Sequence, residues 1–153
     1  MKKTLFSILT ILFFVITSNG QNINEQLYES IVKNDKVQVA HLLKNSANAN
    51  YIKSSGPWMK VSMLITAVNN NNFDIVKLLI ENKADVNWKD GFQTTALMYA
   101  ASKGNKDISI LLLDNGADIN ASDGQGNTVL SAAKVSNNKE LIKYIQDLLK
   151  ARK

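Results

Sequence analysis

Apolar residues in this chain fall in short runs that fit helical hairpins, and the clearest stretch extends from Thr95 to Asn120. Its sequence, TALMYAASKGNKDISILLLDNGADIN, predicts a helix, a tight turn, a second helix and a polar loop. Toward the end of the chain, Leu141, Ile145 and Leu148 share one apolar stripe at helical spacing, with polar residues opposite. The pattern predicts an all-α chain with short connecting loops and no true sheet.

The hairpin pattern repeats along the chain. Leu64, Leu97 and Leu130 lie 33 residues apart, and Ala84–Asn87 returns as Ala117–Asn120 at the same spacing. A fixed period of this size, with one helical hairpin in each period, indicates a stacked repeat protein. Because one hairpin buries too little apolar surface to be stable alone, each unit depends on its neighbours.

About four helix-turn-helix units are expected within a repeat domain that covers residues 21–153, at about 24–50, 62–87, 95–120 and 128–150. The first unit is offset by 37 residues rather than 33, which places four extra residues in the loop Tyr51–Val61. That loop holds the only proline, Pro57, in a turn-forming cluster. Ser62, Thr95 and Thr128 each precede a predicted helix and are expected to accept hydrogen bonds from its free backbone N–H groups.

The predicted turns use residues that tolerate the left-handed backbone conformation. Between the two helices of successive units the sequence offers Asn34, Asn71, Gly104 and Asn137. At the end of a second helix, Lys83 stands where Gly116 stands one unit later, which costs about 1 kcal/mol relative to Gly. The repeated choice of turn residue supports the repeat register independently of hydrophobicity.

These motifs resemble those of the ankyrin repeat family over roughly residues 24–150. Thr95–Ala101 resembles the family's T-P-L-H-x-A-A start, Gly104–Ile108 resembles its inter-helix turn, and Leu111–Asn120 resembles its L-L-L-x-x-G-A-D-x-N ending. The departures are mild, since the family's proline is replaced by Met63, Ala96 and Val129. The resemblance implies an ankyrin-repeat solenoid whose loop tips and first helices line a concave surface for a protein partner.

Carried over position by position, the resemblance assigns to that surface Trp58, Met59, Asn69, Asn70, Phe92, Thr94, Ser102, Lys103, Gln125, Asn127, Val135 and Ser136. Among the loop residues, the aromatic side chains of Tyr51, Trp58, Trp88 and Phe92 stand out, because the solenoid needs no large apolar group there. Aromatic anchors are typical of energetically important interface positions. In the alternative interpretation the rings fold back over the hydrophobic edge, and this is favoured for Tyr51 and Trp88.

The chain begins with Lys2 and Lys3, an apolar run from Leu5 to Ile16, and small residues at Ser18 and Gly20. This order predicts a secretory signal peptide, residues 1–20, cleaved before Gln21. The alternative is a membrane anchor, but the run is about a dozen residues and a spanning helix needs about 20. We therefore expect an exported protein, periplasmic or secreted, with no membrane attachment after cleavage.

The remaining composition argues against other classes of partner and against catalysis. The lysines are spread over the helices instead of gathering on one face, so nucleic acid is not an expected partner. The chain has no cysteine, which excludes disulfides and thiolate metal sites. His41, the only histidine, falls at a packing position, while Asp85 and Asp118 occupy equivalent loops where their side chains bond to the backbone. The segment Asp123–Asn127 is expected to be a glycine-containing turn instead of a calcium loop.

The sequence therefore predicts no catalytic residues, no metal and no cofactor. The expected function is non-catalytic protein–protein binding outside the cytoplasm by a chain that is a monomer by itself. The alternative is binding of a cell-envelope saccharide or another non-protein ligand by the loop aromatics.

Overall fold

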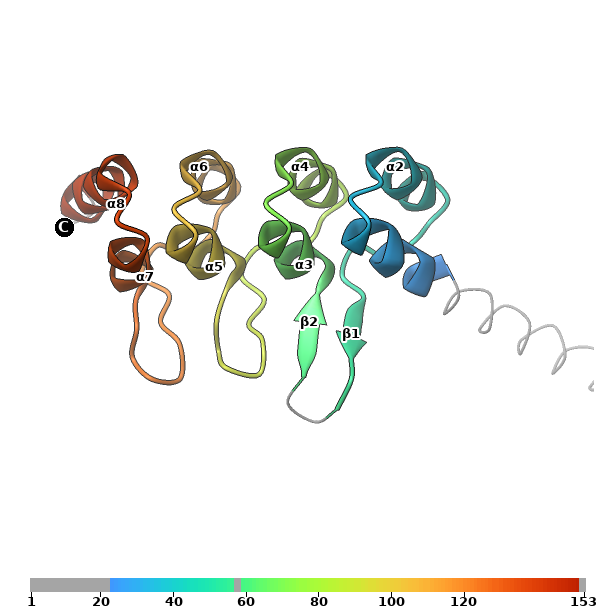
Figure 1. Cartoon of the computed structure of the whole chain (residues 1–153), viewed down its shortest axis with the longest axis horizontal. Coiled ribbons are helices and arrows are strands. Elements are labelled where there is room, and N and C mark those ends of the chain that lie inside the picture. The colour runs from blue at the N-terminus through green and yellow to red at the C-terminus, as the bar shows by residue number, and fades with distance from the viewer. Residues whose placement is uncertain (1–22, 57–58, 152–153) are drawn as a thin grey trace, which may run out of the picture.

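The computed structural model describes residues 23–56 and 59–151, which form helical hairpins placed side by side in one row (Figure 1). The inner layer lies next to the connecting loops and contains residues 23–32, α3 (Met63–Asn69), α5 (Ala96–Ser102) and α7 (Val129–Val135). The outer layer contains α2 (Lys36–Lys44), α4 (Phe73–Glu81), α6 (Lys106–Asp114) and α8 (Lys139–Ala151). This arrangement confirms the predicted stack of helix-turn-helix units.

The core lies between the two layers and continues from one unit to the next. Leu64 and Leu97, at equivalent repeat positions, are almost fully buried. The alanines at another repeated position, Ala67, Ala100 and Ala133, are fully buried as well. Because these side chains are small, neighbouring hairpins approach closely and the repeated apolar positions join into one core.

The starts of α2 to α8 are each fixed by a side chain that the repeat supplies. Ser62, Thr95 and Thr128 each accept a hydrogen bond from the backbone N–H three residues on, at 3.1, 3.3 and 3.2 Å. The outer helices are capped in the same way by Asp35, Asn72, Asn105 and Asn138. A cap of this kind satisfies one of the free N–H groups at a helix start, so both layers begin at defined residues.

The predicted turn residues do adopt the left-handed conformation. The φ angle is 57° at Asn34, 59° at Asn71, 70° at Gly104 and 57° at Asn137. Lys83 has a φ of 66°, against 87° for its counterpart Gly116. The repeat register derived from the sequence is therefore correct at these turns.

The expectation that the chain has no true sheet is wrong. β1 (Ile52–Ser54) pairs antiparallel with β2 (Lys60–Ser62), in the register Ile52↔Ser62 and Ser54↔Lys60. The four extra residues of the first connection lengthen this hairpin enough for a regular ladder. The next two hairpins are shorter, and each forms one isolated bridge, Lys89↔Thr95 and Ser122↔Thr128.

Asparagine side chains join the bases of the first two hairpins to the next unit. The side-chain amide of Asn50 donates to the Lys83 carbonyl at 2.8 Å, and its Oδ1 accepts from the Asp85 N–H at 2.7 Å. Asn87 repeats both bonds, to the Gly116 carbonyl at 3.0 Å and from the Asp118 N–H at 2.8 Å. These bridges hold the hairpins side by side.

The predicted signal peptide, residues 1–20, lies outside the described residues. Among the residues that are described, no helix combines the length and the apolar character needed to cross a membrane.

Candidate functional site

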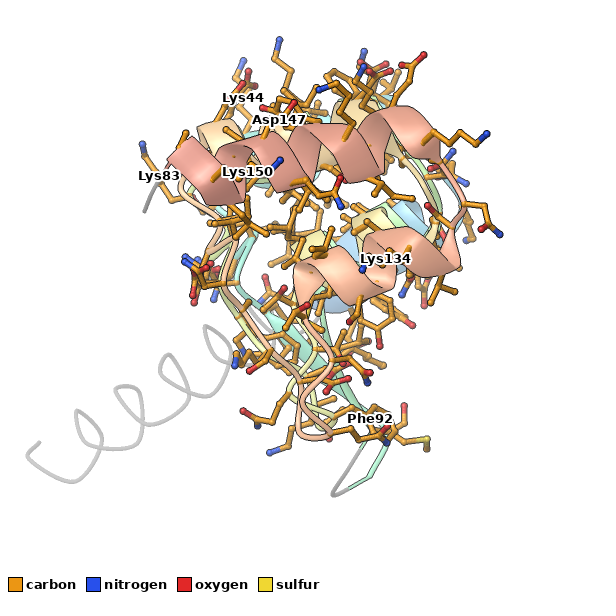
Figure 2. The ribbon with its side chains drawn as sticks, turned by 90° about the vertical axis from the view of Figure 1, so that its left-hand side faces the viewer. Lys44, Lys83, Phe92, Lys134, Asp147 and Lys150 are labelled. Carbon is orange, nitrogen blue, oxygen red and sulfur yellow. The ribbon has the colours of Figure 1, made fainter. Side chains whose placement is uncertain are left out.

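The inner helices and the hairpins together form one continuous surface, here called the inner face. The hairpins project away from the helical layers, and their tips lie beside one another along the row (Figure 1). Figure 2, which looks along the row, shows Phe92 at the hairpin end farthest from the helices. The inner face therefore has a helical floor and a wall of hairpins.

A hollow of about 290 Å³ lies on the inner face between α5 and α7. It is lined by residues of both helices and of the two neighbouring hairpins: Thr94, Met98, Tyr99, Ser102, Asp123, Asn127, Ser131, Ala132 and Val135. The lining combines hydroxyl and amide groups with apolar side chains. Such a mixture fits a side chain of a partner that carries both an apolar body and a hydrogen-bonding group.

The hairpin beside this hollow is built around a buried carboxylate, Asp90. Its Oδ1 accepts hydrogen bonds from the N–H groups of Phe92 and Thr94, both at 2.9 Å. Its Oδ2 accepts the Tyr99 hydroxyl at 2.7 Å, which ties the hairpin to α5. The sequence analysis missed Asp90, although its position 33 residues before Asp123 is a signal that could have found it.

The electrostatics of the two hairpins follow from these contacts. Burial, and then the hydrogen bond to Asp90, raises the pKa of Tyr99 from 10.0 to about 12. The Asn127 side-chain amide, which donates to Asp123 at 2.8 Å, is the main cause that holds the pKa of that carboxyl below its usual value. Both groups therefore keep their charge state, neutral phenol and carboxylate, throughout the neutral pH range.

The hairpin tips carry exposed apolar side chains. Phe92 is 70% exposed and Met59 is 65% exposed. The backbone carbonyl of Phe92 accepts the Gly124 N–H at 3.1 Å, so the tip is fixed to the next hairpin while its ring remains in solvent. Trp58, the neighbour of Met59 in sequence, lies outside the described residues.

A comparison with protein-family models identifies the family of this repeat protein. A family model of ankyrin repeats, in three copies, matches residues 27–123 and 63–152. The chain belongs to the ankyrin repeat family. A search of curated proteins gave no match. Ankyrin repeats are in general protein–protein interaction modules and typically have no enzymatic activity.

The structure divides the other predicted partner-binding residues of this ankyrin repeat chain into two groups. Those with exposed side chains are Asn69, Lys103, Gln125, Asn127 and Val135, in addition to the two tip residues. Asn70, Thr94, Ser102 and Ser136 are half-buried. Thr94, Ser102, Asn127 and Val135 come together in the hollow.

Three of the half-buried residues have structural partners through their side chains. The Ser136 hydroxyl donates to the Ala133 carbonyl at 2.6 Å and accepts from the Asn138 N–H at 3.2 Å. The amide of Asn70 donates to the Ile31 carbonyl at 2.8 Å and so joins the first two ankyrin units. The Ser102 hydroxyl donates to the Tyr99 carbonyl at 2.9 Å. Asn70 is therefore a joint between units, while Ser102 stays available through its position in the hollow.

Tyr51 and Trp88 both pack against the core of the ankyrin solenoid, as the alternative interpretation favours. The Tyr51 hydroxyl also donates to Glu25 at 2.5 Å, and Lys53 binds the other oxygen of that carboxylate at 2.5 Å. The two hydrogen bonds, first from Lys53 and then from Tyr51, lower the pKa of Glu25. These contacts attach the first inner helix to β1.

The prediction that His41 is part of the packing is wrong. Its side chain is exposed and lies 3.2 Å from the Asn45 amide, one turn along α2. The corresponding side chains of α4 and α6, Leu78 and Leu111, are half-buried and pack against the core. In the described part of the chain, no group of three or more His, Cys, Asp or Glu residues is placed to hold a metal ion.

The aspartates that the sequence assigns to backbone bonding do have that role. Asp85 accepts from the Asn87 N–H and Asp118 from the Asn120 N–H, both at 2.9 Å. In the turn at Asp123, Oδ1 accepts from the N–H groups of Gln125 and Asn127, both at 2.8 Å. All three carboxylates therefore stabilise loops.

Proposed function

We propose that this ankyrin repeat chain is a non-catalytic binding module that holds a protein partner on its inner face. The observation that carries the proposal is the pair of exposed apolar tips, Met59 and Phe92, on neighbouring hairpins. The hairpin of Phe92 also lines the hollow between α5 and α7 through Thr94. A partner that covers the tips removes two large apolar side chains from water, and burial of each contributes about 1.5–3 kcal/mol. Hydrogen bonds from the polar side chains of the hollow then fix the orientation of the partner.

The arrangement favours a protein over a saccharide. A sugar-binding site needs aromatic faces and free polar groups side by side, but Tyr51 and Trp88 pack against the core. The polar groups near Trp88 are already used, since both ends of the Asn50 amide bond to the following unit and Asp85 bonds to the Asn87 N–H. Phe92 presents an exposed ring, and exposed rings of this kind anchor protein interfaces.

Nucleic acid is not part of the proposal, since several of the described lysines pair with acids. Lys36 and Asp74 lie 2.9 Å apart, and Lys106 and Glu140 lie 3.0 Å apart. A nucleic-acid surface needs unpaired basic side chains gathered on one face. The module itself acts as a monomer that offers one inner face to one partner.

Export is also part of the proposal and rests on the pattern of residues 1–20. The partner then belongs to the periplasm or to the medium outside the cell. Amino-terminal sequencing of the protein from the producing cells tests this step. The expected mature chain starts at Gln21, whereas a protein that keeps Met1 contradicts export by a cleaved signal.

A photo-crosslinking experiment tests the binding face. A photoreactive phenylalanine analogue replaces Phe92 in one variant and Val37 in a matched control, since Val37 is 80% exposed on the outer helix α2. Irradiation of producing cells is expected to give one defined protein adduct with the analogue at position 92. Equal adducts at both positions, or no protein adduct at position 92 while the chain is retained on cell-wall material, contradict the proposal.

A further inference from the structure

The outer layer contains a second hollow, which the proposed function does not use. It lies between α4 and α6, which are neighbours in the row (Figure 1), and has a volume of about 350 Å³. It is lined by Phe73, Asp107, Ile110, Leu111 and Asp114, a set here called the outer groove. Phe73 is 43% exposed, and both carboxylates are exposed. An apolar floor thus lies between two acidic side chains.

A comparison of equivalent repeat positions shows what is unusual near Asp107, the first of these acids. A lysine opens α2, α6 and α8, whereas Phe73 opens α4. Two of these lysines bind an acid of the following unit: Lys36 binds Asp74 at 2.9 Å and Lys106 binds Glu140 at 3.0 Å.

Asp107 is the acid at the corresponding place in α6, 33 residues after Asp74. By the same register its lysine belongs at position 73, where the chain has Phe73 instead. Among the described residues, Asp107 consequently forms no ion pair within 4.0 Å. An exposed aromatic ring lies where the neighbouring units place a cation.

The second acid has lost its lysine in the same way. Two outer helices carry a lysine–acid pair one turn apart, Lys77–Glu81 in α4 at 4.0 Å and Lys143–Asp147 in α8 at 2.7 Å. The same two places in α6 hold Ile110 and Asp114. Asp114 therefore has no ion pair among the described residues either, and an apolar side chain again occupies the position of the missing lysine.

Both replacements line the same outer groove, so one surface combines two unpaired carboxylates with two apolar side chains. The nearby lysines do not neutralise it, because Lys77 pairs with Glu81 and Lys106 with Glu140. Together α4 and α6 carry four acidic and two basic residues, although the whole chain has a net charge of +5. The groove is thus locally acidic on a basic protein.

We propose that the outer groove binds an exposed segment of a partner protein in which two basic residues flank an apolar side chain. The two basic residues replace the two missing lysines as ion-pair partners, one for Asp107 and the other for Asp114. These acids are seven residues apart on α6, or about 10 Å along the helix. An extended segment with basic residues at positions i and i+4 spans about 13 Å, and their long side chains reach both acids.

The same spacing brings the apolar residue at i+2 onto the side of the segment that faces the groove, against Ile110 and Leu111. An arginine fits the first position best, because its guanidinium can lie against the Phe73 ring while it forms a forked pair with Asp107. The outer groove is therefore a second docking surface, on the side opposite the inner face.

A titration with a synthetic peptide tests the proposal. The probe is Gly-Arg-Gly-Leu-Gly-Arg-Gly, and the matched control peptide has Glu in place of both Arg residues. Chemical shifts of the backbone amides of the ¹⁵N-labelled chain report where and how tightly each peptide binds. The Arg peptide is expected to shift amides of α4 and α6, and to bind more weakly as salt is added.

Two variants make the test specific. Phe73→Lys restores the lysine of the neighbouring units and is expected to weaken Arg-peptide binding at least tenfold while the thermal midpoint stays or rises. Val37→Lys adds the same charge on α2, where Val37 is 80% exposed, and is expected to change the affinity less than twofold.

The proposal is wrong if the Arg peptide shows no binding at millimolar concentration, or binds no tighter than the Glu peptide. It is also wrong if both lysine variants weaken binding equally, because charge alone then explains the effect. A dimer in sedimentation that Phe73→Lys converts to monomer contradicts an external partner, since a second copy then occupies the groove.

Discussion

The hairpins 88–95 and 121–128 occupy equivalent places in successive units and share one construction. Each closes with one isolated bridge, Lys89↔Thr95 in the first and Ser122↔Thr128 in the second. Each wraps around an aspartate whose Oδ1 accepts two backbone N–H groups, at 2.9 Å for Asp90 and 2.8 Å for Asp123. The backbone of the hairpin therefore depends on the aspartate.

The two hairpins differ in what surrounds that aspartate and in what they present to solvent. Asp90 is buried and bound by the Tyr99 hydroxyl, whereas Asp123 is half-buried and bound by the Asn127 amide. At the tip, Phe92 corresponds to Gln125, and both are exposed. The same frame thus accepts either side chain, which indicates that the Phe92 ring is not needed for folding.

The largest effect is expected from removing the buried carboxylate. Asp90→Ala leaves two N–H groups and the Tyr99 hydroxyl without their acceptor and is expected to lower the free energy of unfolding by about 3 kcal/mol. Asp123→Ala, the matched change in hairpin 121–128, is expected to lower the free energy of unfolding clearly less. Denaturant titration of both variants measures the difference, and equal losses contradict the view that hairpin 88–95 is anchored to the core.

The next largest effect on stability is expected from removing the Tyr99 hydroxyl. Tyr99→Phe is expected to lower the free energy of unfolding by about 1.5 kcal/mol at neutral pH, the value of a hydrogen bond to a charged group. Since the pKa of Tyr99 is raised to about 12, the unfolded chain loses this proton first, near pH 10.0. Stability from this bond is therefore full below pH 10 and falls as the pH rises toward 12.

The Tyr99→Phe variant should lack this part of the alkaline loss. Denaturant titrations of both proteins across that pH range measure it, and lysine titration contributes equally to the two. If the free energies of unfolding of the two proteins differ by a constant amount through the whole pH range, ionisation of Tyr99 does not cause the alkaline loss of stability.

A smaller effect is expected at the left-handed turn position. Gln93 has a φ of 63°, whereas Gly126 at the same place in the next hairpin has a φ of 84°. Gln93→Gly is expected to raise the thermal midpoint by a few degrees, since it relieves about 0.5–1 kcal/mol of strain. Gly126→Gln, the reverse change, should lower it. Shifts of the same sign in both variants contradict the equivalence of the two turns.

Much of this fold could be predicted because residues with the same structural role recur at equivalent positions of successive units. Ser62, Thr95 and Thr128 cap their helices as expected, and Asn71 and Gly104 adopt the left-handed turn. The β1–β2 ladder could not be predicted in the same way. Within the described residues it occurs in one unit only, and a three-residue strand has too little periodicity to stand out from a loop.

The candidate site was predicted less completely than the fold. Phe92 is exposed and Thr94 and Asn127 line the hollow, while their role in partner binding stays a prediction. The role of Asp90 was missed because a loop aspartate next to Gly91 resembles any turn in sequence, and its burial depends on Tyr99 from another element. Side-chain partners that cross between elements leave little trace in the local pattern.

The most direct test of the proposed inner-face binding compares stability and affinity in one variant. In Met59→Ala/Phe92→Ala both tip side chains are removed, and its affinity for the protein crosslinked at position 92 is measured by calorimetry beside its thermal midpoint. We expect affinity to fall at least thirtyfold, or about 2 kcal/mol, while the midpoint shifts by no more than about 2 °C. Unchanged affinity, or a loss of stability as large as that of Asp90→Ala, would contradict a binding role for the exposed tips.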